Sequence, residues 1–459
     1  MKKTSLIIVA LLLAAIAVLP IVGNKFMQNY VEDTLGNIDA HGLKLLTLKT
    51  DASYLSTKKH FEFVIEDSSE FVAYMNAHAH TQLPTQTQSD LDGTVLGLDV
   101  SYSNIPFAKS IHFALYPLKL SKVVSDALKT EDINFYEQFS QFLKHKGLLY
   151  YGEYNLINSK FKSYVKDIDE HYALQNASDV NITLKGVSFK GEGDILAPQK
   201  LVTELKTLRF EAAQKETHAK LLVKDFEAMN HFVSWSDYTN AAAFEKIEFV
   251  IEGTQDDVNI SAEALQSSSN AALKHQRVAM HSKTSLKRLL ISSKQLNVAV
   301  TKFHENASIT DIALKPFERL SALIEDTQNT NIMAQQQAMQ EDTLALLGEG
   351  LKIRIDDISL ENVTLNHTQK LGGLKINLDL NVKKDADLLK KMQQSPLLLL
   401  ANMDMDSKVM LSETLYKLLL QNSPMAQQIT AYAKKERNSV VFDIAFHKAK
   451  LQVNGKTLQ

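Results

Sequence analysis

Residues 374–382 read Leu-Lys-Ile-Asn-Leu-Asp-Leu-Asn-Val. Apolar and polar side chains alternate without exception, and this period of two is typical of a β-strand with one buried face. Covering the five apolar side chains contributes roughly 7 to 15 kcal/mol, at about 1.5 to 3 kcal/mol each. A shift by one residue would expose all five, so the stretch fixes both a strand and its register.

Further elements are expected on the C-terminal side of this strand. Residues 385–394 predict a helix that ends at Ser395-Pro396, and residues 412–421 predict a short amphipathic helix. Leu451 and Val453 lead to Asn454-Gly455, a turn dipeptide. Alternation predicts two more strands, one with Leu398, Leu400, Met403 and Met405 and one with Phe442, Ile444 and Phe446.

The same alternation recurs on the N-terminal side. Its first three runs lie close together in the sequence and predict an antiparallel meander. The apolar positions of the expected strands are Phe61, Phe63 and Ile65; Leu96, Leu98, Val100 and Tyr102; Ile111, Phe113 and Leu115; Ile182 and Leu184; Val187 and Phe189; Leu208 and Phe210; Ile247, Phe249 and Ile251; Val258 and Ile260; Leu296, Val298 and Val300; and Leu351, Ile353 and Ile355.

Two stretches change to the spacing of three and four residues that is typical of a helix. One helical face within residues 123–143 carries Ile133, Tyr136, Phe139 and Leu143, and Pro316 begins a second helix. Residues 328–340 are rich in Gln and Asn, which predicts an exposed helix or a loop joining two parts near residue 330. The expected fold class is α+β, dominated by antiparallel β-sheet with a few amphipathic helices.

The N-terminus carries an uncharged run over residues 4–24, between Lys3 and Lys25. A helix of this length rises roughly 31 Å, which matches a hydrocarbon core of about 30 Å. Positive charge before the run predicts that the N-terminus stays in the cytoplasm and that the rest of the chain is exported. Ala15-Ile16-Ala17 resembles a signal-peptide cleavage site, so removal of residues 1–17 stays open, but the spanning length favours a retained transmembrane helix.

These signals predict a single-pass protein of a bacterial inner membrane. We expect a signal anchor over residues 1–24, a strand-rich periplasmic region over residues 25–330, and a strand and helix region of the same periplasmic body over residues 331–459.

Composition narrows the class of protein. Hydrophobic residues make up 45% of the 459 residues, enough for a sizeable core, and charged residues make up 22%. The formal net charge is −3 and the basic residues are scattered, which argues against a nucleic-acid partner. The chain has no cysteine, so neither a disulfide nor a lipoprotein anchor is possible.

The chain resembles a known bacterial family in its anchor-like start, its strand-rich middle and the helix from Pro316. The resemblance continues through residues 346–353 (Leu-Leu-Gly-Glu-Gly-Leu-Lys-Ile), the strand at 374–382 and residues 451–456 (Leu-Gln-Val-Asn-Gly-Lys). These segments are similar to the YdgA-like proteins, described as domain of unknown function 945. The resemblance implies a periplasmic protein attached to the inner membrane of a Gram-negative bacterium, and it implies no functional residues.

Motifs that could carry chemistry are few. Residues 56–59 and 159–162 fit Ser-x-x-Lys, in which a lysine lies one helical turn from a nucleophilic serine, but no Ser-Asp-Asn or Lys-Thr-Gly partner follows. His78 with His80, and Asp404 with Asp406, could each provide two metal ligands, although a site needs three or four. Trp235 is interpreted as packing. We therefore name no catalytic, cofactor-binding or metal-binding residue.

The apolar strand faces suggest a binding function. Helices starting near Asp132, Pro316 and Ser412 would cover these faces in an ordinary core, which is the interpretation that the sequence favours. In the alternative, a curled sheet holds a lipid chain against its concave side. That side would carry Ile247, Phe249, Ile251, Leu374, Ile376, Leu378, Phe442 and Ile444.

The leading hypothesis for function is non-enzymatic: a membrane-anchored periplasmic protein that binds a lipid or another envelope component, or acts as a scaffold. The alternative is a periplasmic hydrolase whose site is assembled from distant residues. The partners expected are the inner membrane through residues 4–24 and a lipid or an envelope protein. The sequence leaves the ligand and the oligomeric state open.

Overall fold

The computed structural model describes residues 41–78, 90–103, 110–175, 178–193, 198–214, 217–253, 257–325, 332–366, 368–395, 398–422 and 430–457. The expected anchor lies outside these residues. Within them, no helix combines the length and the apolar character that a membrane span requires. Antiparallel strands make up most of the described chain and a few helices accompany them, which confirms the predominance of antiparallel sheet.

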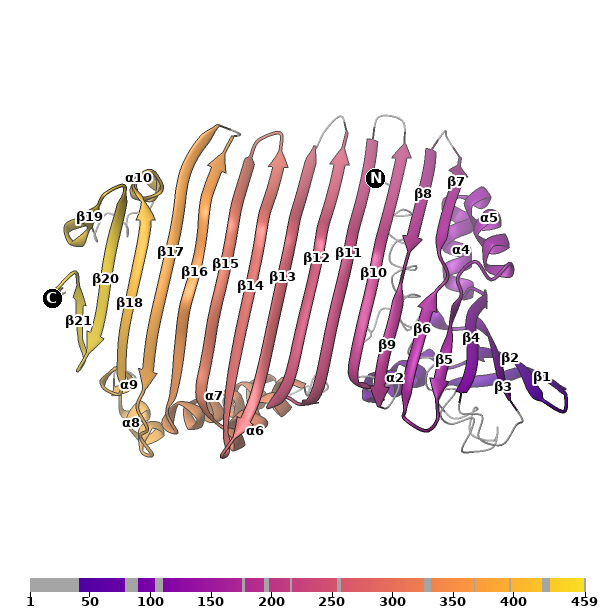
Figure 1. Cartoon of the computed structure of the whole chain (residues 1–459), viewed down its shortest axis with the longest axis horizontal. Coiled ribbons are helices and arrows are strands. Elements are labelled where there is room, and N and C mark those ends of the chain that lie inside the picture. The colour runs from indigo at the N-terminus through magenta and orange to yellow at the C-terminus, as the bar shows by residue number, and fades with distance from the viewer. Residues whose placement is uncertain are drawn as a thin grey trace. The chain divides into compact units, whose positions relative to one another are not determined.

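The described chain, whose elements Figure 1 labels, divides into two compact units. The first comprises the residues up to Asn230 together with Ile247–Asp257, and the second comprises His231–Lys246 and Val258–Gln459. Strands β11 (Thr217–Ser234) and β12 (Asp237–Glu252) are shared between them. The boundary between the two units runs through β11 and β12, whereas the sequence suggests a boundary near residue 330.

The first unit is built from ten strands and three helices of the described chain. In chain order they are β1 (Leu43–Ala52), β2 (Ser56–Ile65), α2 (Ser68–His78), β3 (Val95–Ser103), β4 (Ser110–Lys119), α4 (Lys122–Glu131), α5 (Ile133–Lys144), β5 (Tyr150–Asn155), β6 (Lys160–Val165), β7 (Ile168–Leu174), β8 (Ser178–Lys185), β9 (Ser188–Gly193) and β10 (Pro198–Gln214). Strands β1 to β6 pair antiparallel in sequence order, so the predicted meander is correct. Strand β10 pairs with β9 along its first half and with β8 along its second.

The core of the first unit lies between this sheet and helices α2, α4 and α5. The predicted inward residues Phe61, Phe63 and Ile65 are at most 1% exposed. Alternation identified them because one face of β2 meets the helices and the other meets solvent. Phe135 of α5 packs against Tyr172 of β7, with ring centroids 5.0 Å apart.

One expected helix of the first unit proves to be two. Asp132 is extended, at φ −160°, and separates α4 from α5. Its buried carboxylate accepts hydrogen bonds from the Phe135 amide (2.9 Å) and from the Gln175 amide (2.6 Å). A carboxylate that caps a new helix N-terminus favours the break. The buried face therefore carries Phe135, Phe139 and Leu143, while the predicted Ile133 is 39% exposed.

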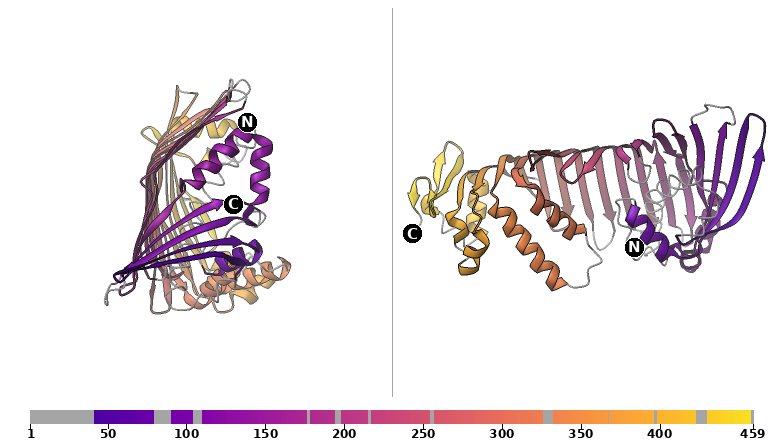
Figure 2. Two further views of the ribbon diagram at one scale, coloured as in Figure 1. Left: turned by 90° about the vertical axis from the view of Figure 1, so that its right-hand side faces the viewer. Right: turned by 90° about the horizontal axis from the view of Figure 1, so that it is seen from below.

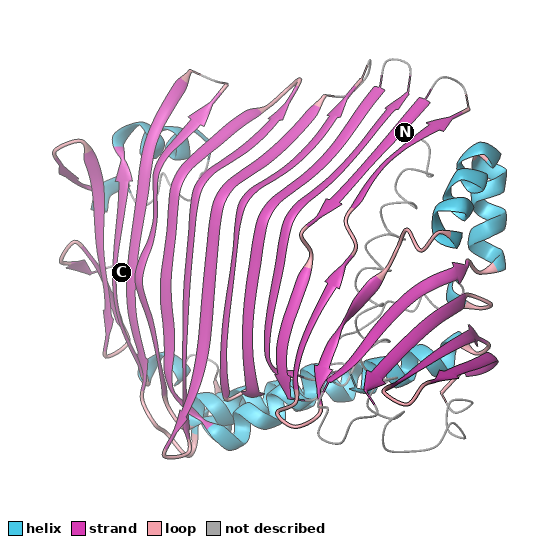
Figure 3. Ribbon diagram, turned by 45° about the vertical axis from the view of Figure 1, so that its right-hand side comes forward, coloured by secondary structure: helices cyan, strands magenta, loops and turns pink. Residues whose placement is uncertain are grey.

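The second unit is a meander of long strands with helices near their ends (Figures 1 and 3). Its elements are β13 (Val258–Lys274), β14 (Arg277–Ser293), β15 (Asn297–Ala313), α6 (Leu314–Glu325), α7 (Ile332–Gly348), β16 (Leu351–Leu365), β17 (Gln369–Val382), α8 (Leu388–Gln394), α9 (Leu398–Ala401), β18 (Met403–Ser412), α10 (Glu413–Asn422), the 3₁₀ turn η2 (Thr430–Tyr432), β19 (Lys434–Glu436), β20 (Ser439–His447), β21 (Lys450–Val453) and β22 (Lys456–Thr457). Each of β13 to β17 pairs antiparallel with the next strand, and β18 pairs with β20.

The turn between β21 and β22 is the predicted Asn-Gly turn. Asn454 has φ 49° and Gly455 has φ 78°. Two central residues with positive φ favour the turn type that suits a two-residue hairpin, and Asn-Gly is the dipeptide that adopts it most readily.

Several boundaries in the second unit differ from those expected. Leu398 and Leu400 were expected in a strand but lie in the one-turn helix α9, so this prediction is wrong, and the strand begins at Met403. Four consecutive leucines before residue 402 have no period of their own, which leaves the choice to tertiary packing. The helix expected from residue 385 begins at Leu388, and Asp385 lies before it with its carboxylate accepting hydrogen bonds from Lys391 and Asn402. The Gln-rich stretch continues into α7.

Candidate functional site

The pairing register of the second unit places apolar side chains on one face of the sheet. In β17 the alternating residues are those of the predicted strand; for example, Ile376 lies opposite Ile358 of β16 and Val409 of β18. Phe442 and Ile444 of β20 continue the same face. We call this the apolar face; its members are Leu265, Met280, Leu286, Phe303, Ile309, Ile353, Ile355, Ile358, Leu360, Leu374, Ile376, Leu378, Leu380, Met405, Val409, Phe442, Ile444 and Phe446.

The described helices bury this face near its margins. Val278 and Ile312 are 0% and 3% exposed where Leu314 and Phe317 of α6 pack against them. Phe442 is 4% exposed where Tyr416 of α10 covers it. Figure 2 (right) shows α6 and α7 extending from one side of the sheet.

The middle of the apolar face has no second layer among the described residues. Ile355, Ile376 and Leu378 are half-buried, and Ile309 is 37% exposed. Neighbouring side chains on a sheet shield one another sideways, whereas full burial requires a second layer. Among the described residues, the margins match the expected closed core, whereas the side chains in the middle stay half-buried.

The opposite face of the same strands is charged. Lys375, Asp379 and Lys408 alternate with the apolar residues, and a groove of about 500 Å³ on this side is lined by Arg354, Asp356, Asp379, Asp406, Lys408 and Asp443. Lys375 lies 3.5 Å from Asp357 and Lys408 lies 3.8 Å from Asp443. The sheet thus turns one hydrated face to solvent, and its other face needs a cover.

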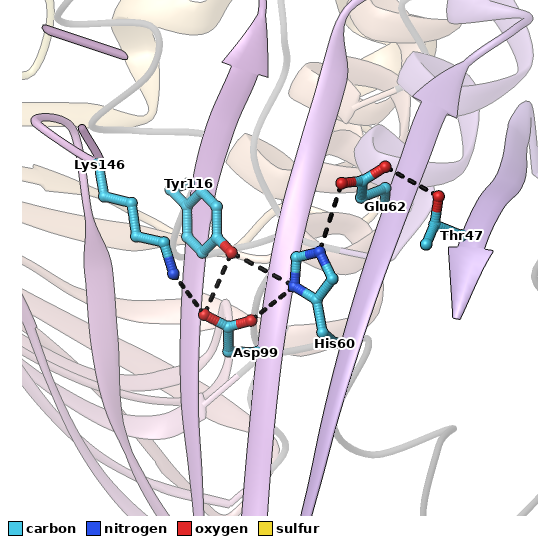
Figure 4. A network of polar contacts seen from close by, with 6 residues as sticks. All are labelled: Thr47, His60, Glu62, Asp99, Tyr116 and Lys146. Atoms are coloured by element: carbon cyan, nitrogen blue, oxygen red, sulfur yellow. Dashed lines mark hydrogen bonds and ion pairs between the residues drawn. The ribbon is translucent and has the colours of Figure 1, made fainter. Parts of the chain in front are cut away.

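A polar network in the first unit is a second candidate (Figure 4). It lies on the face of β2 and β3 opposite the core, because His60 and Asp99 alternate with buried residues. His60 Nδ1 is 2.7 Å from Asp99 Oδ1, Lys146 Nζ donates to Asp99 Oδ2 at 2.7 Å, and the Tyr116 hydroxyl donates to Asp99 Oδ2 at 3.1 Å. Lys146 Nζ also lies 4.0 Å from the centre of the Tyr116 ring.

Local backbone features place the groups of this network. Tyr116 lies opposite Gly97 in the register, and a Cβ at Gly97 would come within 2.5 Å of the tyrosine ring. Glycine at this position therefore lets the ring lie across β3 and reach Asp99. Lys146, just after α5, has φ 51°, which turns its side chain back toward the sheet.

The network pairs its acids and bases with one another. Partial burial of Asp99 opposes ionisation, but hydrogen bonds from Lys146 and His60 outweigh it and lower the pKa of Asp99. Burial likewise opposes the charge of Lys146, and its bond to Asp99 raises the lysine pKa overall. His60 Nε2 faces Glu62 Oε1 at 3.4 Å, so carboxylates hold both ring nitrogens. These contacts link β2, β3, β4 and the end of α5, and they occupy both ring nitrogens of His60, whereas a general base needs a free one.

Replacing Asp99 by asparagine tests this structural role. The lowered pKa means that ionised Asp99 stabilises the fold above the carboxyl pKa of the unfolded chain, and that this contribution is lost as the pH falls through the folded value. We expect Asp99→Asn to lower the free energy of unfolding at pH 7 by about 1 kcal/mol, a figure reduced for solvent screening. The variant should also lose less stability than the wild type below about pH 4. Urea unfolding at several pH values measures both effects.

Asp169→Asn is the matched control for this prediction. Asp169 lies 2.6 Å from Lys185 on the surface of the same unit, and its bond to that lysine lowers its pKa. Since this pair is fully solvated, its removal should change stability less than Asp99→Asn does. Equal effects of the two substitutions would remove the argument for a structural network.

The sequence motifs do not assemble into a catalytic site. Ser56 and Lys59 lie three residues apart on an extended strand, so their side chains point to opposite faces. Ser159 is in the β5–β6 turn with φ 52°, and Lys162 lies in the strand that follows. Neither pair has the helical spacing that the Ser-x-x-Lys mechanism uses.

The candidate metal ligands form no metal site among the described residues, although Asp404 and Asp406 both lie near His447. His78 ends α2, its side chain is not described, and His80 lies outside the described residues. Asp404 is 2.6 Å from Lys383, and Asp406 is 3.0 Å from His447, whose pKa is raised by hydrogen bonds to Asp406 and Asp404. No group of three or more metal-ligating side chains occurs in the described part of the chain.

The structure also gives the positions of Trp235 and of the residues predicted to line a concave face. Trp235 is 52% exposed and packs edge-on against Phe232, with ring centroids 5.5 Å apart. Ile247, Phe249 and Ile251 belong to the first unit, so the apolar face described here includes only the predicted residues from 374 onward. Sequence reasoning missed the network around Asp99, since its members are scattered over 100 residues; charged positions on the outer side of β2 and β3 were the only local signal.

Comparisons of the chain with protein-family models, with curated proteins and with solved structures each find no match.

Proposed function

We propose that this chain is an inner-membrane protein of the bacterial envelope, anchored by residues 4–24, and that its apolar face binds the acyl chains of a lipid in the periplasm. The observation that carries the proposal is the middle of the apolar face, where Ile355, Ile376 and Leu378 stay half-buried and no described element covers them. A contiguous exposed apolar surface of this kind marks a binding site for an apolar partner. Membership of the YdgA-like family and the periplasmic location stay predictions, and both agree with this role.

The dimensions of the apolar face suit an acyl chain. From residue 374 to residue 382, eight steps at about 3.4 Å each extend roughly 27 Å along β17. One leaflet of a bilayer is about 15 Å of hydrocarbon, so a single strand is long enough for one chain. The strands from β13 to β18 lie about 4.8 Å apart and provide width for two chains side by side.

The rival hydrolase has less support. The network around Asp99 does bring together residues distant in sequence, as that hypothesis requires, but its acids and bases are hydrogen-bonded to one another. A binding surface accounts for the two-sided sheet, because an apolar ligand would remove that face from water.

Lipid that co-purifies with the chain tests the proposal. We expect the full-length protein, extracted with a mild detergent, to carry a diacyl lipid in native mass spectrometry. After removal of that lipid, a fluorescent fatty acid should bind and should be displaced by added phospholipid. Burial of two acyl chains supports a dissociation constant in the micromolar range or tighter, at about 0.8 kcal/mol per buried CH₂ less the costs of association.

Two controls separate lipid binding from other covers of the face. Extraction in two unrelated detergents distinguishes retained lipid from bound detergent. Sedimentation analysis of the delipidated chain measures whether a second copy covers the face instead. A dimer that binds no fatty acid, with Ile376 protected from hydroxyl-radical labelling, would contradict the proposal.

A further inference from the structure

One carboxylate interrupts the apolar face. Glu305 of β15 lies between Phe303 and Ala307 in the alternating row, and its register partners are Ile358 of β16 and Thr284 of β14. Between the row of Met280 and Ile309 and the row of Leu286 and Phe303, Glu305 is the one ionisable side chain among the described residues that the register assigns to this face. The other ionisable side chains at such positions lie further along or at the edge of the sheet: Glu263 and Arg288 lie beyond Leu265 and Leu286, and Lys435 lies opposite Val440. A single charge between apolar rows opposes the local pattern of the face.

Hydroxyl groups surround this carboxylate. The Ser282 hydroxyl donates to Glu305 Oε1 at 2.6 Å, and Ser267 Oγ lies 3.3 Å from Thr284 Oγ1 on the adjoining strands. Ser269 lies opposite Ser282. We call Ser267, Ser269, Ser282, Thr284 and Glu305 the polar patch.

The polar patch has apolar residues on both sides along the strands. Met280 and Ile309 lie toward α6, and Leu286 and Phe303 lie in the other direction. A ligand with a polar centre and apolar arms therefore matches the order of groups along β14 and β15.

Glu305 has no basic partner in the described chain. Other acidic residues near it on β15 and β16 form ion pairs, such as Asp311 with Lys352 at 3.0 Å and Glu361 with Lys302 at 2.8 Å. Glu305 is half-buried and bonded only to a neutral hydroxyl. A lipid covering the face would remove water from this carboxylate, and an unpaired charge away from water is strongly unfavourable. A ligand that brings a cation to this position removes the penalty and keeps the carboxylate ionised.

We propose that the apolar face selects a phospholipid whose head group carries a primary ammonium. That ammonium donates to Glu305, which Ser282 holds in place, and the hydroxyl of Ser269 donates to the phosphate together with whichever of Ser267 and Thr284 does not donate to the other. The inference rests on the proposed lipid-binding function. An ammonium group donates three hydrogen bonds and pairs with a carboxylate by charge. A choline head group carries the same charge without a donor, and a glycerol head group leaves the phosphate charge uncompensated beside Glu305. The expected order of affinity is phosphatidylethanolamine, then phosphatidylcholine, then phosphatidylglycerol.

Competition between lipids on the full chain tests this order. Each of the three phospholipids, with identical acyl chains, displaces a fluorescent fatty acid from the delipidated protein in detergent at low salt. Wild type should prefer phosphatidylethanolamine over phosphatidylglycerol by at least about tenfold, the expected scale for one charge-assisted hydrogen bond. Glu305→Gln, which keeps the shape of the side chain, should reduce that ratio to about one, and Ser282→Ala should reduce it in part.

Glu361→Gln is the matched control. It removes a carboxylate from the neighbouring strand, but that carboxylate is paired with Lys302. The control should keep the wild-type preference, and free ethanolamine should displace no fatty acid. An unchanged preference in Glu305→Gln, or no preference in wild type, overturns this inference and leaves the proposed function standing. A wild-type chain that binds no fatty acid and no phospholipid overturns the proposed function itself.

Discussion

Replacing Phe135 by alanine is expected to lower the free energy of unfolding of the first unit by about 3 to 5 kcal/mol, the range for a buried aromatic residue cut to alanine. Phe135 is 0% exposed. Its ring lies 5.5 Å from that of Phe139 and 5.0 Å from that of Tyr172, so α5 is joined to β7 through this side chain. The cavity would lie between helix and sheet, where neither backbone can move to fill it without losing other contacts.

Ile133→Ala is the control on the same helix. Ile133 is two residues earlier and 39% exposed, so its truncation should change stability by about 0.5 kcal/mol or less. Urea unfolding followed by circular dichroism measures both variants, and hydrogen exchange should report faster opening in the peptides of α5 and β7 for Phe135→Ala. Similar losses from the two substitutions would mean that α5 does not cover the sheet in solution.

The strands that alternation predicted are those with one face against a core or a continuous apolar surface. Phe61, Phe63 and Ile65 are fully buried in β2, and residues 374–382 occupy most of β17. The helix positions were less predictable, because their boundaries depend on side chains that bond elsewhere in the chain. Asp132 accepts a bond from Gln175, 43 residues away, and a search for helical spacing within residues 123–143 has no access to that contact.

The candidate site also has a part that the sequence predicts and a part that it does not. The sequence predicted that Leu374, Ile376, Leu378, Phe442 and Ile444 share a face, because alternation is a local property, and the register confirms it. Whether helices cover that face depends on where α6 and α10 pack, which no local pattern specifies. Glu305 did leave a local signal, since it occupies an apolar position in the row Phe303, Glu305, Ala307, Ile309. A charged residue at a position where the alternation predicts an apolar one was the sequence signal that indicated the polar patch.

Placing a charge in the middle of the apolar face is expected to abolish lipid binding while the fold survives. Ile376 lies between Ile358 and Val409 and is half-buried, and none of the described helices covers it. In Ile376→Asp, a bound acyl chain would strip water from the new carboxylate at a cost of several kcal/mol, which lowers the affinity for the fluorescent fatty acid by about 100-fold or more. The free protein keeps this position hydrated, so its free energy of unfolding should fall by only about 1 kcal/mol.

Asn381→Asp separates this effect from that of charge alone, because it adds the same carboxylate to the same strand on the opposite, charged face, where Asn381 lies across from Lys352 and Asp404. That variant should bind the fatty acid as wild type does. The pair of variants also decides between an open face and a closed core. In a closed core Ile376 would be buried in the free protein, so Ile376→Asp would cost stability in proportion to an unpaired buried charge and the chain would unfold at low urea whether or not lipid was present. On an open face the penalty arises only when a ligand covers the carboxylate. In that case Ile376→Asp should lower the affinity for the fatty acid strongly and change the free energy of unfolding only slightly.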